Sequence, residues 1–299
     1  MRTQPRDRTV AASAPSSTDA ATARGLRTLI HRNLDARLGL ARLATHAGMS
    51  TFRTHRLFQA ETGMPPARYV LLLRLKRASM RLAFEARRSI TDIAFEAGYA
   101  NAESFSRAFR RCLGQSPSAF RATPEWLRWR TVFGFQATTE ANREHAAMNV
   151  EIVDFPETRV AAVEHLGSTT NVYDSTRRLI EWRIANRVPP QGHATYGVHH
   201  DLRTHADAGY RMDVCVAYDR EVAPNPQGVV ARVIPGGRCA RVRHVGSREF
   251  IPVVQPLFTE WLPGSGETLR DFPVFFHYVN VGPGVQDHEM ITDVYLPLA

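Results

Sequence analysis

The chain has few cysteines, a single lysine and no long hydrophobic run. Cys112, Cys215 and Cys239 stand far apart in 299 residues, without a CxxC pair or a Cys/His metal spacing. We therefore expect no metal and no cofactor, and a reducing, cytoplasmic setting in which these cysteines fill small core spaces. The absence of any run near eighteen apolar residues excludes a predicted membrane span. Residues 1–23 also lack the apolar stretch of a signal peptide, and their composition predicts a disordered tail.

Charge is distributed unevenly along the chain. Residues 24–130 contain 20 basic against 7 acidic side chains, whereas residues 131–299 contain 15 against 20. Almost every basic residue is arginine, with Lys76 the only lysine. Arginine suits bidentate contacts to phosphate and guanine, although a biased genome is the favoured explanation for the choice of arginine over lysine. The uneven distribution predicts a nucleic-acid-binding part followed by a part with another function.

Residues 40–122 contain one helix-turn-helix pattern twice. The copies are LARLATHAGMSTFRTHRLFQAETGMPPARY, residues 40–69, and ITDIAFEAGYANAESFSRAFRRCLGQSPSAF, residues 90–120. Gly48 suits a turn that needs positive φ, and Ser50 is a good N-cap for the helix that follows. Apolar spacing predicts an opening helix over 24–37 and a long helix over 67–85 that joins the copies. Two such units joined by one stiff helix can read two successive stretches of major groove.

The second helix of each copy has an inward and an outward face. At about 100° per residue, Thr54 and Phe58 point inward in the first copy. Arg56 and Arg107 occupy matching outward positions, which favours base or phosphate contact over the alternative of solvated surface arginines. An outward Phe52 suits a thymine methyl group, the alternative being packing on a neighbouring loop. The predicted DNA-contacting residues are Phe52, His55, Arg56 and Gln59, with Glu103, Ser106, Arg107 and Arg110.

These residues resemble the AraC/XylS family of transcription regulators over about residues 26–122. The signature lies in ITDIAFEAGYANAESFSRAFRRCLGQSPSAFR, supported by FQAETGMPPARYVLLLRLKRA of the first copy. The resemblance implies an all-α domain of seven helices over 24–122 that binds double-stranded DNA, with RNA polymerase as a further partner. One departure is Thr54, where the family usually has a large apolar residue.

A second duplication follows the predicted linker 123–148, whose Trp126/Trp129 stretch is a candidate for packing back on a domain. FPETRVAAVEHLGSTTNVYDSTRRLIEW, residues 155–182, aligns without gaps to IPGGRCARVRHVGSREFIPVVQPLFTEW, residues 234–261. His165 and His244 recur in it, which favours a structural role over metal binding. Alternating and apolar runs predict two β-β-α-β-β halves over 149–299. The whole is thus a multidomain chain, an all-α double helix-turn-helix domain followed by an α+β domain of two pseudo-symmetric halves. The seam between the halves is a natural ligand groove.

This second region resembles the GyrI-like effector-binding domain over about residues 149–298, through FPETRVAAVEHLG, YRMDVCV and HEMITDVYLPL. The resemblance implies a groove for small hydrophobic, often cationic, molecules, with an acidic residue two positions before a tyrosine. Phe276 holds that position before Tyr278, which favours a neutral or aromatic effector. For Asp213 a structural role is favoured over ligand binding. The candidate effector residues are Trp182, Tyr196, Tyr210, Trp261, Phe276, Tyr278 and Glu289, the tryptophans being equally good core residues.

The sequence thus predicts a DNA-binding transcription regulator controlled by a small-molecule effector. Two alternatives stay open: a GyrI-like hydrolase of small molecules, and a module that binds gyrase or another protein. Because no evident general base stands beside Tyr278, we expect no enzyme and no catalytic residue.

Overall fold

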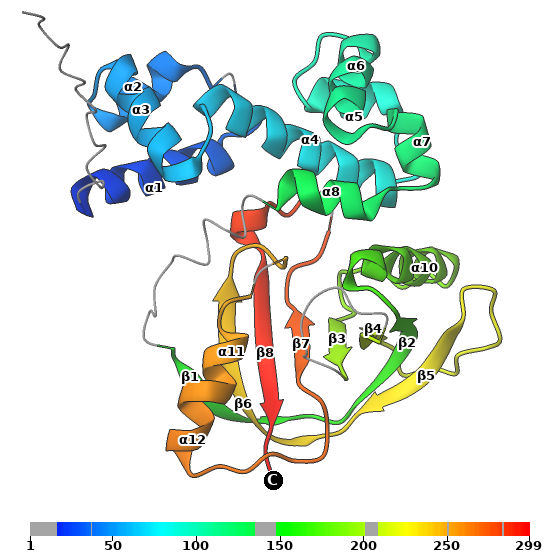
Figure 1. Cartoon of the computed structure of the whole chain (residues 1–299). Helices are drawn as coiled ribbons and strands as arrows, with labels where there is room; N and C mark the ends of the chain where they lie inside the picture. The colour runs from blue at the N-terminus through cyan, green and yellow to red at the C-terminus, as the bar shows by residue number, and fades with distance from the viewer. Residues whose placement is uncertain (1–16, 37, 135–147, 201–208, 250, 283) are drawn as a thin grey trace, which may run out of the picture. The chain divides into compact units, whose positions relative to one another are not determined.

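A computed structural model describes residues 17–36, 38–134, 148–200, 209–249, 251–282 and 284–299. The chain divides into two compact units, Met1–Leu73 and Arg74–Ala299, so their boundary falls inside helix α4 (Pro66–Phe84). The domain division after residue 122 that the sequence predicts stays a prediction. Figure 1 shows the helices and strands of each unit. Within the described ranges, no helix is both long enough and apolar enough to cross a membrane.

The first unit contains the first helix-turn-helix. It comprises α1 (Ser17–Arg32), α2 (Leu40–Ala47), α3 (Thr51–Thr62) and the start of α4. Helix α1 begins and ends earlier than predicted, because alanines before Leu26 extend the helix and Ala23 is itself buried. Residues 17–23 are therefore helical, while residues 1–16 of the predicted tail lie outside the described residues.

The predicted turn and cap of the first helix-turn-helix are confirmed. Gly48 ends α2 with a φ of 62°, a conformation that side chains with a Cβ rarely adopt. The Ser50 hydroxyl accepts a hydrogen bond from the backbone N–H of Arg53 at 3.3 Å. Thr54 is fully buried and its hydroxyl donates to the Ser50 carbonyl at 2.9 Å. A threonine fits this core position because the backbone satisfies its polar atom.

The second helix-turn-helix packs on a helix that lies in the predicted linker. It comprises α5 (Ile90–Glu96), α6 (Ala102–Leu113) and α7 (Pro117–Ala122), followed by α8 (Trp126–Phe133). Phe105, Phe120, Trp126 and Trp129 are buried, in a row of aromatic contacts that runs from α6 into α8. This row explains why the compact unit continues past residue 122; residues 135–147 of the predicted linker lie outside the described residues.

One antiparallel sheet of eight strands forms the C-terminal domain, within the described ranges. The strands are β1 (Val150–Phe155), β2 (Thr158–Leu166), β3 (Thr195–His199), β4 (Arg211–Ala217), β5 (Val229–Ile234), β6 (Gly237–Val245), β7 (Phe275–Tyr278) and β8 (Ile291–Pro297). Their order is β1-β6-β8-β7-β3-β4-β2-β5, which maps onto itself when the two halves are exchanged. The pseudo-twofold axis therefore passes between β7 and β3, as the duplication predicts.

The two halves exchange their first strands, a feature that the duplication did not indicate. β1 pairs with β6 of the second half, and β5 pairs with β2 of the first half. The two connections approach closely, because a Cβ on Gly236 would lie 2.7 Å from the backbone nitrogen of Glu157. A glycine is needed at this position, and the exchange joins the halves into one sheet.

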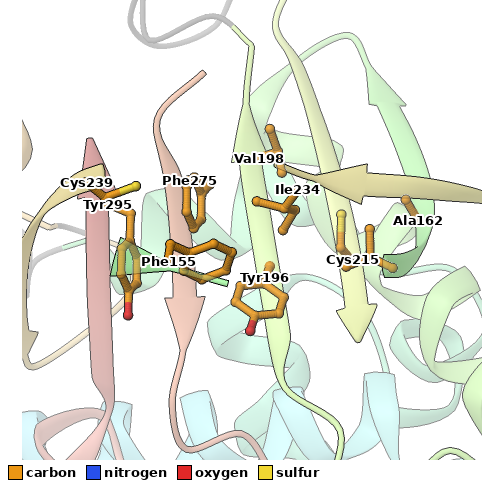
Figure 2. Packing of buried hydrophobic residues seen from close by; sticks show 10 residues of the cluster. Phe155, Ala162, Tyr196, Val198, Cys215, Ile234, Cys239, Phe275 and Tyr295 are labelled. Atoms are coloured by element: carbon orange, nitrogen blue, oxygen red, sulfur yellow. The ribbon is translucent and has the colours of Figure 1, made fainter. Parts of the chain in front are cut away.

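The two faces of the sheet differ in what packs on them. One face contains Phe155, Tyr196, Phe275 and Tyr295, which pack together in Figure 2. The register places Val214, Gly197 and Phe276 together on the opposite face. That face is covered by two helical segments: η1 (Thr169–Asn171) with α10 (Val172–Ala185), and α11 (Val254–Pro256), η2 (Leu257–Trp261) and α12 (Leu262–Ser265). The seam between the halves lies on this helix-covered face.

Candidate functional sites

The outward face of α3 presents an aromatic ring and a guanidinium group together. Phe52 is 70% exposed, and the Arg56 guanidinium carbon lies 5.8 Å from the centre of its ring. Gln59 is exposed and His55 is half-buried on the same helix. An exposed phenylalanine beside a cation suits a partner that offers both apolar and anionic surface, as a DNA groove does.

The outward face of α6 is more polar. Arg107 and Glu103 form an ion pair at 2.5 Å, and both side chains are more than half exposed. Arg110 is exposed and Ser106 is half-buried. Because an exposed ion pair contributes about 1 kcal/mol or less, Arg107 can exchange Glu103 for a DNA atom at little cost. Base contact by the two helices stays a prediction.

A cluster at the seam of the C-terminal domain brings together residues of β7 and β3. The rings of Phe276 and His199 lie 4.1 Å apart between centroids. The hydroxyl of Tyr278 lies above Gly197, where a Cβ would be only 2.7 Å from it. The sequence indicated Phe276 and Tyr278 but missed His199, whose only signal is its place two residues after Gly197 on the same face of the strand.

His199 has a polar atom buried in this seam cluster. Its Nδ1 is hydrogen-bonded to the Tyr210 hydroxyl at 2.8 Å, and that hydroxyl also contacts the sulfur of Met212 at 3.4 Å. Its Nε2 is buried without a hydrogen-bond partner in the described part of the chain. Burial, and then the neighbouring His200, lower the pKa of His199 to about 4. The ring is therefore neutral at physiological pH, and its Nε2 atom can form one hydrogen bond with a ligand.

The lowered pKa of His199 predicts a dependence of stability on pH. The folded-state pKa of about 4 lies below the ordinary value of 6.5, so the unfolded chain binds the proton more readily. The free energy of unfolding should thus fall as the pH drops from 6.5 towards 4, by about 3 kcal/mol at most from this group. Denaturant unfolding of His199→Gln should show a smaller fall across this window. An equal fall in both proteins would contradict the assignment, and the exposed His46→Gln serves as the control.

Tyr278 carries its phenol in a buried, positively charged surrounding. The Arg248 guanidinium carbon lies 5.1 Å from the centre of the Tyr278 ring. Burial raises the pKa of Tyr278 to about 12, with Arg248 opposing that shift, so the phenol stays protonated. Phe276 occupies the position where the family resemblance implies an acidic residue, and it is buried. A protonated phenol without an adjacent carboxylate at this position is a poor general base.

Other predicted effector residues lie in different places. Trp182 is a buried residue of α10 that packs against Tyr218, whereas Trp261 is partly buried in the same apolar cluster as Phe276. Tyr196 lies on the opposite face, 4.9 Å from His277 between ring centroids, because adjacent strand residues alternate. The Glu289 carboxylate accepts from the backbone N–H of Gln286 at 3.2 Å and caps η3 (Asp287–Glu289). The structure thus groups Tyr210, Phe276 and Tyr278 around His199, but not Tyr196 or Glu289.

A hollow of about 430 Å³ lies elsewhere, along strands β2 and β5. Arg159, Tyr218 and Arg232 line it, and none of the candidate effector residues does. It is therefore separate from the seam.

The repeated histidines have equivalent structural contacts. The Nε2 atoms of His165 and His244 lie 3.1 Å and 3.2 Å from the carbonyl oxygens of Ser168 and Ser247, respectively. Each histidine therefore holds the turn after its strand. Asp213 is buried and paired with His200 at 3.0 Å. Among the residues that the structure describes, no group of His, Cys, Asp or Glu is arranged to hold a metal ion.

Comparison with known families agrees with this architecture. A model described as the GyrI-like small molecule binding domain matches residues 148–299, half of the chain. The chain belongs to the GyrI-like family. Another model, described as a helix-turn-helix domain, matches residues 43–123 and is of the AraC type. The GyrI-like domain therefore follows a DNA-binding domain, and the chain is a DNA-binding transcription regulator.

Individual relatives of this GyrI-like chain have different names. It is 37% identical to the probable transcriptional regulator YgiV of Escherichia coli (strain K12), covering 51% of this chain and 97% of that protein. It is 33% identical to the right origin-binding protein of the same strain, covering 34% of this chain and 35% of that protein. It is 27% identical to a DNA gyrase inhibitor of Erwinia billingiae (strain Eb661), covering 51% of this chain and 98% of that protein.

Proposed function

We propose that a small neutral molecule, hydrophobic or aromatic, binds at the seam of the GyrI-like domain and controls DNA binding by the helix-turn-helix domain. The observation that carries this proposal is the cluster of Phe276, Tyr278 and His199 at the pseudo-twofold axis, in which the Nε2 atom of His199 is buried without a hydrogen-bond partner in the described part of the chain. A regulator of transcription acts on the chromosome, so we expect it in the cytoplasm.

The charges around the seam favour a neutral ligand over a cationic one. Arg248 lies over the Tyr278 ring, and Phe276 supplies no carboxylate. A cation would lose water and meet a second cation there, which is unfavourable in a buried site. A neutral aromatic molecule would gain from stacking on Phe276 and from a hydrogen bond to His199.

The test uses two probes of opposite character on the full chain. N-phenyl-1-naphthylamine is neutral, aromatic and carries one N–H, whereas tetraphenylphosphonium is a cation. We expect the neutral probe to bind about tenfold more tightly than the cation, and Phe276→Glu to reverse that preference. Fluorescence titration and calorimetry measure both affinities. Val279→Glu places the same charge on an exposed side chain nearby and should leave the preference unchanged.

Several outcomes would oppose the proposal. If circular dichroism shows that Phe276→Glu is unfolded, Phe276→Gln should still lower the affinity for the neutral probe. Equal affinities for both probes in all variants would contradict a binding site at Phe276. Conversion of a bound probe to product would favour the hydrolase. Binding to gyrase alone would favour the protein-binding module, which the similarity to a DNA gyrase inhibitor brings into consideration.

Control of DNA binding has its own measurement. The full chain is used to select a duplex from a random-sequence pool, and affinity for that duplex is measured with and without saturating N-phenyl-1-naphthylamine. A coupling of about 1–3 kcal/mol, or roughly 5- to 150-fold, is typical of such regulation. An unchanged affinity with the probe demonstrably bound would rule out control by ligands of this kind.

A further inference from the structure

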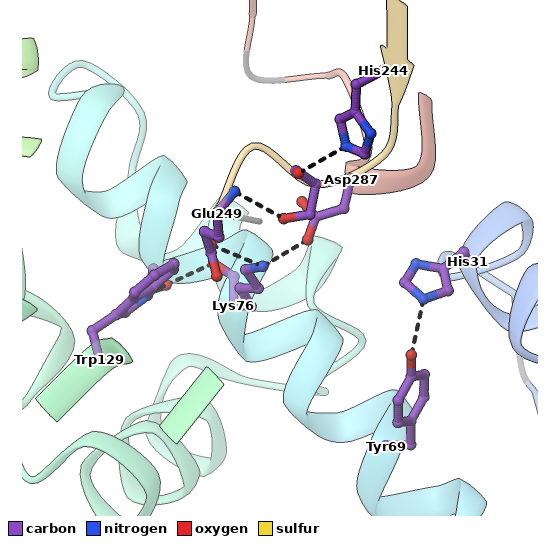
Figure 3. Close-up of polar contacts among 9 residues, drawn as sticks. His31, Tyr69, Lys76, Trp129, His244, Glu249 and Asp287 are labelled. Carbon is purple, nitrogen blue, oxygen red and sulfur yellow. Dashed lines mark hydrogen bonds and ion pairs between the residues drawn. The ribbon is translucent and has the colours of Figure 1, made fainter. Parts of the chain in front are cut away.

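The only lysine of the chain is buried against the GyrI-like domain. Lys76 of α4 is 5% exposed, and its Nζ lies 2.6 Å from Asp287 and 2.9 Å from Glu249 (Figure 3). The same atom lies 5.6 Å from the centre of the Trp129 ring. Burial would lower the pKa of this amine, but attraction to Asp287 and Glu249 outweighs it and raises the pKa. Lys76 therefore stays charged inside the protein.

The cluster holds one more negative than positive charge. Two carboxylates share one buried ammonium, and burial raises the pKa of Glu249. Withdrawing Glu249 alone leaves Lys76 paired with Asp287, whereas withdrawing both carboxylates leaves a buried ammonium without compensation, which is strongly unfavourable. Small movements of the segments that hold Glu249 and Asp287 are thus converted into a choice between a closed and an open contact.

The segments that hold both carboxylates border the proposed ligand site. Arg248, next to Glu249, lies over the Tyr278 ring and donates to the backbone carbonyl of Asn280. The side chain of Asn280 donates to the Glu289 carbonyl at 2.6 Å and accepts from the backbone N–H of Ile291 at 2.7 Å. A change at Tyr278 therefore reaches Glu249 through Arg248, and the turn that holds Asp287 through Asn280.

The equivalent turn in the first half of the domain has no such carboxylates. At the repeat offset, Thr169 and Thr170 stand where the second half has Arg248 and Glu249. Their hydroxyls accept from Arg130 of α8 at 3.0 Å and 3.3 Å. Each turn thus contacts a basic side chain of a helix, but the turn in the first half pairs Arg130 with neutral hydroxyl groups. Arg130 also acts on Glu249 by its charge, so Arg130→Gln serves as a comparison that leaves both contacts of Lys76 in place.

We propose that Lys76, Glu249 and Asp287 form a clamp that transmits occupancy of the seam to helix α4. This inference rests on the proposed function, because it assigns how that same site acts. A ligand that displaces Arg248 from Tyr278 withdraws Glu249 directly and Asp287 through Asn280, and so opens the clamp. Helix α4 runs without interruption from Pro66 to Phe84 and connects the two helix-turn-helix copies in sequence. Opening the clamp therefore changes the support of the helix on which DNA reading depends.

The single lysine permits a direct measurement of the clamp. Full-length protein is treated with sulfo-N-hydroxysuccinimide acetate, and acetylation of Lys76 is followed by peptide mass spectrometry. Saturating N-phenyl-1-naphthylamine should accelerate this acetylation about tenfold, because an open clamp exposes the amine. Glu249→Gln should accelerate it without the probe, whereas Arg130→Gln should not. An unchanged rate with the probe bound would overturn the inference.

A second experiment measures how the clamp affects affinity for DNA. Lys76→Met and Glu249→Gln should each shift affinity for the selected duplex in the direction in which the probe shifts the wild-type chain. In both variants the probe should then change affinity by less than about twofold while still binding. Full response to the probe in Lys76→Met, with an unfolding temperature near that of the wild type, would overturn the clamp. If Lys76→Met fails to fold, Glu249→Gln and Asp287→Asn decide the question.

The failure of the clamp is distinguishable from failure of the proposed function. If the wild-type chain binds the probe and responds on DNA, but the variants respond equally, the clamp is wrong and the effector site stands. If the wild-type chain does not bind the probe, the ligand assignment is wrong. Glu249→Gln still tests the clamp in that case, since an unchanged Lys76 acetylation rate and DNA affinity would refute it.

Discussion

Replacing Arg56 and Arg107 together with alanine is expected to weaken binding to the selected duplex by about 30-fold to 10⁴-fold. Each bidentate arginine contact to a base contributes about 1–3 kcal/mol, and losses in separate helices add approximately. Both side chains are exposed, so their removal should leave the fold intact. Electrophoretic mobility shift or fluorescence anisotropy, with thermal unfolding to confirm folding, measures the result.

A matched control separates base contact from general attraction. Arg111→Ala removes one positive charge from an exposed residue of α6 that is not among the predicted base contacts. Arg111→Ala should lower the affinity for selected and random duplexes by the same factor. The double substitution should lower mainly the affinity for the selected duplex. Wild-type affinity should fall steeply between about 50 and 200 mM salt, since phosphate contacts release counterions. Retention of the selected footprint by the double variant would refute the assignment of these arginines.

Trp129→Ala is expected to lower the free energy of unfolding by about 3–5 kcal/mol, the usual cost of truncating a buried tryptophan. Trp129 is fully buried, and its indole N–H donates to the Ser79 hydroxyl at 2.6 Å. Its ring also contacts Phe133 and Tyr173. The substitution therefore removes apolar contacts, leaves a cavity and removes the donor to the Ser79 hydroxyl, which still donates to the Lys76 carbonyl at 2.6 Å. Urea unfolding followed by circular dichroism measures the loss.

The same helix contains the control for this prediction. Leu127 is 72% exposed, so Leu127→Ala should change stability by only about 0.5 kcal/mol. A similarly small effect of Trp129→Ala would mean that α8 does not support the unit Arg74–Ala299. In that case residues 126–133 would act as the linker that the sequence predicts.

Helix α8 shows where reading the sequence was insufficient. Its aromatic residues at 126, 129 and 133 have helical spacing, but the helix is short and follows Pro124. Trp129 and its partner Ser79 are separated by 50 residues, and no local pattern connects them. By contrast, the caps at Ser50 and Gly48 follow from local backbone requirements and were predictable.

The candidate effector site was predicted in part for a similar reason. Phe276 and Tyr278 lie on one face because alternate strand residues share a face. Tyr196 lies on the other face, although its strand is apolar on both sides and alternation alone leaves its direction open. Only the pairing of Gly197 with Phe276 establishes which residues of β3 meet the seam. His199 and Arg248 join the cluster through that pairing and through a turn between distant segments.

The two duplications, most helices and strands, and the family of each half could be recognised from the amino-acid sequence. These features depend on periods of about 3.6 and 2 residues and on residues that cap or turn the chain locally. Tertiary structure alone decided the exchange of β1 and β5 and the partners of Lys76, which lie as far as 211 residues away in the chain. Strand exchange and buried charge pairing are interactions between distant segments, whose energies depend on packing and desolvation that no local pattern records.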